Sequence, residues 1–69
     1  MKESVLREIK AETPGIIVLS HGGFALEMLS TAEMICGEME NVVAVGIYPG
    51  DDLDLYRERL EELIARFPA

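Results

Sequence analysis

The spacing of apolar residues changes along the first half of the chain. Residues 2–11 place Val5, Leu6 and Ile9 on one face at helical spacing, which predicts a short amphipathic helix. Residues 12–15 (ETPG) end this pattern, because proline disfavours helical geometry in the residue before it. Residues 16–20 (IIVLS) form an almost wholly apolar, β-branched run, which is typical of a strand buried on both faces of a parallel sheet.

The second half of the chain predicts a helix, a strand and a helix. Helical spacing resumes over residues 23–35, and Gly37 is placed to end that helix. Residues 42–48 (VVAVGIY) predict a second buried strand, and the turn PGDD follows, in which Asp51 or Asp52 can cap the last helix. The predicted apolar stripes are Ala25, Met28, Leu29, Ala32 and Ile35 in one helix, and Leu53, Tyr56, Leu60, Leu63 and Phe67 in the other.

The order of these elements predicts an α/β fold. A strand, a helix and a second strand imply a parallel pair with a right-handed crossover. This is the unit from which open parallel sheets with helices packed on them are built. Two strands alone leave open apolar edges, so we expect the chain to form a homo-oligomer, most simply a two-fold dimer.

Composition narrows the class of protein and its partners. With 69 residues the chain can hold one domain at most. Thirteen acidic residues against six basic ones argue against nucleic acid or an anionic membrane as partner. The single cysteine cannot form an internal disulfide, which favours a cytoplasmic location. The longest apolar run is too short to insert into a membrane, and the charged N-terminus does not resemble a signal peptide.

The single histidine, His21, is the main candidate for chemistry. It follows the first predicted strand, at the carboxyl end where ligands gather in open α/β sheets. Gly22 and Gly23 allow a tight turn, and the next helix offers free N–H groups to an anion. A neutral imidazole beside such a site can attack a phosphoryl group. We therefore predict that His21 is catalytic and that Ser20, Gly22 and Gly23 bind the phosphate; a surface or structural histidine is the alternative.

Other polar residues carry less chemistry. Cys36 closes an apolar helical stripe and is expected to be a small core residue rather than a reactive thiol. Asp51 and Asp52 could suggest a metal site, but turn and capping chemistry explains them better. The sequence predicts neither a metal nor a cofactor.

A longer match links these features. Three motifs follow one another: a strand ending in His-Gly, TAEMI-x-GE-x-ENV after the helix, and YPGDD after the second strand. Together they resemble the enzyme IIA domain of the mannose/fructose/sorbose family of the bacterial sugar phosphotransferase system (PTS). The resemblance implies a phosphoryl carrier with His21 as the phosphorylated residue, the phosphocarrier protein HPr as donor and enzyme IIB as acceptor, with no cofactor.

The resemblance covers only part of the family's domain. It implies further strands and an Asp-x-x-Gly-Gly segment whose acid orients the active histidine, and no such segment follows Phe67. Neither Asp51 nor Asp52 lies at the position of this orienting acid. We therefore expect a helical extension over residues 1–14 and a partial IIA domain, half of a doubly wound fold, over residues 15–69.

Two other functions remain open. The chain could be a truncated, non-catalytic regulatory or interaction module of the same fold. Alternatively, HGGF after a strand resembles the oxyanion-hole loop of α/β-hydrolases. Catalysis by an α/β-hydrolase needs a Gly-x-Ser-x-Gly elbow and a second histidine, and the chain has neither.

Overall fold

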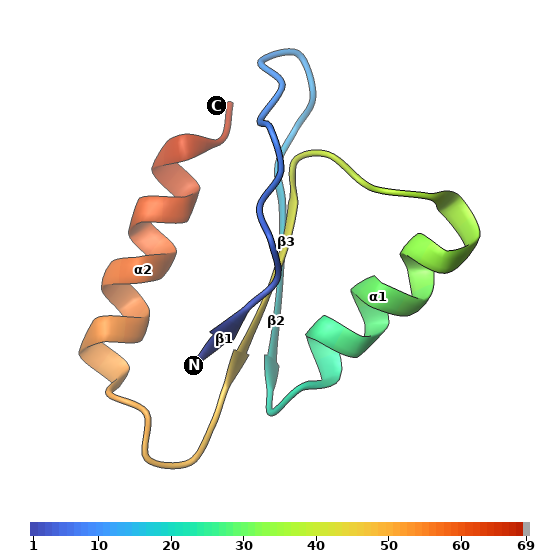
Figure 1. The fold of residues 1–69 in the computed structure, drawn as a ribbon. Helices are drawn as coiled ribbons and strands as arrows, with labels where there is room; N and C mark the ends of the chain where they lie inside the picture. The colour runs from blue at the N-terminus through green and yellow to red at the C-terminus, as the bar shows by residue number, and fades with distance from the viewer. Residues whose placement is uncertain (69) are drawn as a thin grey trace.

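The computed structural model describes residues 1–68, which form a three-stranded mixed sheet between two helices (Figure 1). The elements are β1 (Lys2–Glu3), β2 (Ile16–His21), α1 (Phe24–Cys36), β3 (Val42–Ile47) and α2 (Leu53–Arg66). The strand order is β1-β3-β2, and the helices cover opposite faces. The predicted α/β class is therefore confirmed.

The strand pair β2–β3 forms the centre of the fold. It is parallel, with Ile16 opposite Val42 and His21 opposite Ile47, as the strand–helix–strand order predicts. The middle of β3 is wholly buried, because a strand or chain segment lies on each side of it and a helix covers each face.

Each face of the sheet has its own apolar cluster. On the α1 face, Ala25 and Leu29 pack with Ala44 of β3. On the α2 face, Leu63 packs with Val43 and Val45 of β3. The alternation of side chains along β3 thus supplies both cores, which is the expected behaviour of a period-2 strand.

Helix ends follow the predicted capping residues. Asp52 is the N-cap of α2, and its carboxylate accepts hydrogen bonds from the N–H groups of Asp54 and Leu55 at 2.9 and 3.3 Å. Gly37 ends α1 at a positive φ of 81°, a conformation that suits glycine.

The prediction of a helix over residues 2–11 is wrong. Lys2 and Glu3 pair antiparallel with Gly46 and Val45 of β3, and residues 4–10 carry no regular secondary structure. Ser4 continues the pairing: its N–H donates to the Ala44 carbonyl, and its hydroxyl accepts from the Ala44 N–H. Hydrogen bonds to the open edge of β3 therefore outweigh the local amphipathic pattern. The boundary between an N-terminal extension and a partial IIA domain after residue 14 remains a prediction.

Three burial predictions also differ from the structure. The strand β2 was expected to be covered on both faces, but Ile16 and Leu19 are about half exposed, at 54% and 48%, because β2 lies at an edge of the sheet formed by residues 1–68. Cys36 is exposed rather than buried. Met28, Ile35 and Leu53 are also exposed, since the covered faces of α1 and α2 are narrower than the predicted stripes.

Candidate functional site

The imidazole of His21 stands at the carboxyl end of β2. The residue is exposed, and the next residue, Gly22, still pairs with β3 by donating its N–H to the Ile47 carbonyl at 2.6 Å. Among the hydrogen bonds and ion pairs of residues 1–68, none involves the imidazole. The exposed imidazole of His21 thus has no polar partner in this part of the chain.

Ser20 shapes the turn after His21. Its hydroxyl accepts a hydrogen bond from the Ala25 N–H at 2.9 Å and donates one to the Gly22 carbonyl at 3.1 Å. Both bonds of the Ser20 hydroxyl are made to the backbone of the turn. A contact between Ser20 and a phosphate stays a prediction. Gly22 adopts a φ of 69°, the left-handed geometry for which glycine was expected here.

The start of α1 offers hydrogen-bond donors beside this turn. Its N-cap residue is Gly23, which has no side chain with which to cap the helix. The Ala25 N–H is taken by Ser20, and the Glu27 N–H donates to the Gly23 carbonyl. The N–H groups of Phe24 and Leu26 have no acceptor within residues 1–68. They are the orphan donors of the first turn, which suit an anion.

Gly46 is a residue of this site that the sequence analysis did not select. A Cβ at Gly46 would overlap the carbonyl oxygen of Gly22, so only glycine lets the turn after His21 lie so closely on β3. The signal was present in the sequence, because an isolated glycine inside a strand indicates close backbone approach.

Two shallow hollows flank His21. One, of about 340 Å³, lies towards α2 and includes Leu19, Ile47 and Tyr56. The other, of about 380 Å³, lies over the loop after β3, from Tyr48 to Asp51. Leu53, at the start of α2, lines both hollows. The site is thus formed by β2, the end of β3 and the beginning of α2, all at one edge of the sheet.

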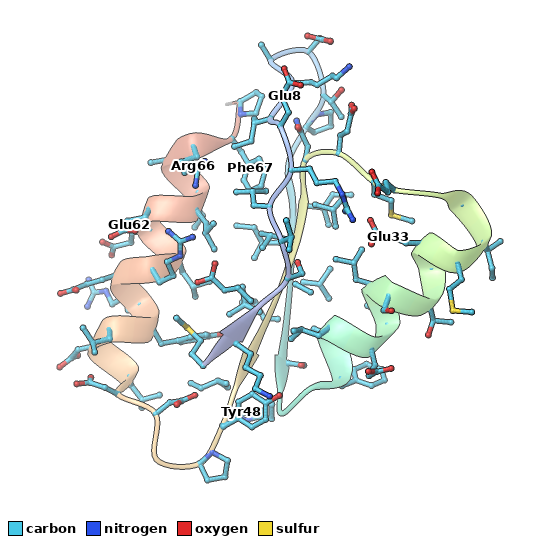
Figure 2. All side chains as sticks on the ribbon, in the orientation of Figure 1. Glu8, Glu33, Tyr48, Glu62, Arg66 and Phe67 are labelled. Carbon is cyan, nitrogen blue, oxygen red and sulfur yellow. The ribbon has the colours of Figure 1, made fainter. Side chains whose placement is uncertain are left out.

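The N-terminus holds the loop that lines the second hollow. The α-amino group of Met1 lies 2.7 Å from the Asp51 carboxylate, whose same oxygen accepts a hydrogen bond from the Tyr48 N–H, also at 2.7 Å. These two hydrogen bonds lower the pKa of Asp51 below 3.8. The ammonium of Lys2 lies 5.7 Å from the centre of the Tyr48 ring, which Figure 2 shows at the end of β3.

The predicted acidic residues take different places. Asp51 belongs to the loop beside His21, whereas Asp52 caps α2. Within residues 1–68, no group of three or more His, Cys, Asp or Glu side chains is arranged to hold a metal ion. In the same part of the chain, neither helix has the length and apolar character needed to cross a bilayer.

Comparison with known proteins decides the family. Residues 15–69 match the family described as "PTS system fructose IIA component". The chain belongs to this PTS IIA family. It is also 35% identical over 54 residues to proteins of Escherichia coli and Shigella flexneri named "PTS system mannose-specific EIIAB component". The matched region is 78% of this chain and 17% of those relatives. No solved structure matches the chain significantly.

The IIA match coincides with most of the described fold. It includes β2, α1, β3 and α2, and with them every residue predicted for the site. The strand β1 and the segment that follows it lie before residue 15, outside the matched region. Met1 and Lys2, which contact the loop beside His21, therefore lie outside the region that matches the PTS IIA family.

Proposed function

We propose that this chain is a phosphoryl carrier of the sugar phosphotransferase system, with His21 as the residue that is phosphorylated. HPr is the donor and enzyme IIB the acceptor, and the transfers take place in the cytoplasm. The observation that carries the proposal is the placement of His21: an exposed imidazole at the carboxyl end of a parallel strand, followed by the left-handed Gly22 and the uncapped start of α1.

The proposed transfer follows from this geometry. A neutral imidazole nitrogen of His21 supplies its lone pair to the phosphorus, while the bond between phosphorus and the donor histidine nitrogen of HPr breaks. The donor nitrogen keeps the electron pair of that bond. The N–H groups of Phe24 and Leu26, which have no acceptor within residues 1–68, are the donors that the first turn of α1 offers to the phosphoryl oxygens. Transfer to enzyme IIB is the same exchange with this chain as the donor.

Phosphorylation in a defined mixture tests the proposal. With enzyme I, HPr and phosphoenolpyruvate, we expect one phosphoryl group on the chain, labile in acid and stable in base. His21→Gln should abolish the label, with circular dichroism unchanged, because the exposed side chain makes no hydrogen bond within residues 1–68. Label that persists in both His21→Gln and His21→Ala would contradict the assignment.

A second function, a non-catalytic module of the same fold, is favoured by one observation. Within residues 1–68, no carboxylate forms a hydrogen bond or ion pair with the His21 imidazole, so none of these acids fixes the ring for attack. Such a module would bind HPr without becoming labelled. Titration of isotope-labelled chain with unphosphorylated HPr, followed by NMR, separates the two: shifts around Gly22 without later labelling support the module.

A further inference from the structure

Tyr48 follows β3 directly and lies beside the turn that leads from His21 into α1 (Figure 2). It lines the hollow of about 380 Å³ together with His21 and Gly22. A Cβ at Gly23, the N-cap residue of α1, would meet the Tyr48 hydroxyl oxygen at 3.2 Å. The next N–H along the chain, that of Phe24, has no acceptor within residues 1–68. The Tyr48 hydroxyl thus adds a side-chain donor beside the backbone donors of this turn.

The hydroxyl of Tyr48 is free to bind a ligand. Among residues 1–68 only the backbone of Tyr48 is hydrogen-bonded near this loop, and both bonds are made to Asp51. No buried side-chain oxygen or nitrogen lacks a partner in this part of the chain, so the unpaired hydroxyl is open to solvent. The backbone bonds to Asp51 therefore hold the residue in place, while its O–H remains available as a donor.

Lys2 brings a positive charge to the ring of Tyr48. In the pairing of β1 with β3, Lys2 lies opposite Gly46, and directly paired residues share one face of the sheet. That face is the one on which the Gly22 turn lies, because a Cβ at Gly46 would overlap the Gly22 carbonyl oxygen. The Lys2 ammonium lies 5.7 Å from the centre of the Tyr48 ring. It forms no ion pair among residues 1–68, whereas four other basic side chains pair with glutamates: Arg7, Lys10, Arg57 and Arg59.

We propose that Tyr48 is a further phosphoryl-binding residue, whose hydroxyl donates a hydrogen bond to an oxygen of the phosphoryl group on His21. Lys2 is its positioning residue: the ammonium holds the ring and adds positive charge beside the dianion. This inference rests on the proposed function, in which His21 carries the phosphoryl group. A hydrogen bond to an anionic oxygen is stronger than one to a neutral acceptor. In a chain of net charge −7, the Lys2 ammonium also offsets the repulsion of an incoming phosphoryl group.

The initial rate of labelling by phosphorylated HPr tests the Tyr48 hydroxyl. Tyr48→Phe keeps the ring and its contact with Lys2 but removes the donor, so the rate should fall about tenfold. The matched control is Tyr56→Phe, which removes the hydroxyl of the other tyrosine. Tyr56 packs with the apolar cluster on the α2 face, away from the Gly22 turn, and its variant should change the rate less than about twofold.

The same assay tests the charge of Lys2. Lys2→Met keeps an unbranched side chain without the charge and should lower the rate about threefold, whereas Lys2→Arg should restore it. Lys10→Met is the control for net charge, because Lys10 pairs with Glu40 and bonds to Asn41 at the other end of β3. A loss that is equal in Lys2→Met and Lys10→Met would show that only the total charge of the chain matters.

Chemical phosphorylation separates this inference from the proposed function. Phosphoramidate transfers its phosphoryl group to an imidazole nitrogen and releases ammonia, and His21 is the only histidine of the chain. A pH titration of this product is followed by phosphorus NMR. The Tyr48 hydroxyl favours the phosphoryl dianion, so the midpoint should lie at lower pH in the unmodified chain than in Tyr48→Phe. The other charged groups beside Tyr48, the Asp51 carboxylate and the Met1 amino group, are the same in both.

The two arms have distinct outcomes. If HPr labels none of the chains but the midpoint rises in Tyr48→Phe and not in Tyr56→Phe, the hydrogen bond stands and the proposed function fails. If HPr labels the unmodified chain, and Tyr48→Phe matches Tyr56→Phe in both rate and midpoint, the role of Tyr48 is overturned and the carrier function stands.

Discussion

Arg59 of α2 binds both carboxylate oxygens of Glu3 in β1, at 2.7 and 2.9 Å. This fork-to-fork contact joins residues 56 positions apart and fixes α2 against the N-terminal strand. Glu3, and to a smaller extent Glu62, raises the pKa of the Arg59 guanidinium by accepting its hydrogen bonds. The contact shows that residues before the family match are part of the same packed unit.

Replacing Arg59 by lysine should lower the free energy of unfolding by about 1 kcal/mol, because lysine keeps the charge but loses the second hydrogen bond. The two side chains are only 29% and 22% exposed, so solvent screens them incompletely. Urea denaturation measures the change. Arg57→Lys is the control, since the Arg57–Glu61 pair is 79% and 64% exposed and should contribute almost nothing. Equal losses in both variants would contradict a special role for the Glu3 contact.

Gly46→Ala should destabilise the chain by about 1–3 kcal/mol, because the added Cβ overlaps the Gly22 carbonyl oxygen. The turn after His21 must then move away from β3, so the phosphorylation rate should also fall. Gly23→Ala is a milder change in the same turn, where the added Cβ would meet only the Tyr48 hydroxyl at 3.2 Å. Denaturation and labelling of both variants provide the comparison. Wild-type rates in Gly46→Ala would show that the turn tolerates the shift.

Gly22 tests the turn through backbone geometry alone, since a Cβ there would meet nothing within 4 Å. Its φ of 69° disfavours side chains, and a β-branched one most. We expect Gly22→Val to impair phosphorylation more than stability and Gly22→Asn to retain more of the rate, because asparagine adopts this region readily. If both variants label as fast as the unmodified chain at equal helix content, the orphan N–H groups of α1 do not hold the phosphate.

Asn41→Ala should lower stability by about 1–3 kcal/mol through unsatisfied backbone groups. The wholly buried side chain accepts from the Lys10 N–H at 2.7 Å and donates to the carbonyls of Lys10 and Thr13. Because Asn41 has a φ of 60°, Asn41→Gly is the informative partner variant: it relieves the backbone but removes the same bonds. Hydrogen exchange over residues 10–13 should rise in both, and unchanged protection there would disprove the link.

Stability in acid should depend on Asp51. Its folded pKa lies below its usual value of 3.8, because the Met1 amino group and the Tyr48 N–H bind the carboxylate. A carboxyl group with a lowered folded pKa stabilises the fold above its unfolded pKa, and this contribution is lost as the pH falls through the folded value. Urea midpoints measured across pH 3.8 should therefore decline less in Asp51→Asn than in the unmodified chain. Parallel curves would mean that the ion pair does not persist in solution.

The sequence predicted the elements whose signals are local. The structure confirms the strand in the apolar run of β2, the helical period of α1, a cap at one of the two aspartates (Asp52) and the helix end at Gly37, because each of these signals depends on neighbouring residues. The position of His21 at a strand end followed directly from this order.

The N-terminal strand could not be predicted in the same way. Lys2, Glu3 and Ser4 pair with residues 40 or more positions away, and Asn41 bonds to the following segment from 28 to 31 positions away. Such contacts leave no periodic trace in the local sequence. The exposure of Cys36 was missed for a related reason, since the width of a covered helix face depends on how broad the sheet beneath it is.

The antiparallel strand β1 also sets a limit on growth. A sheet with two open edges can add copies at both sides and extend into a filament, as in other open-ended assemblies. Here β1 occupies the outer edge of β3 with only two residues, a length too short to recruit a further strand efficiently. The short N-terminal strand therefore closes the sheet of the described residues on the β3 side and prevents further copies from adding there.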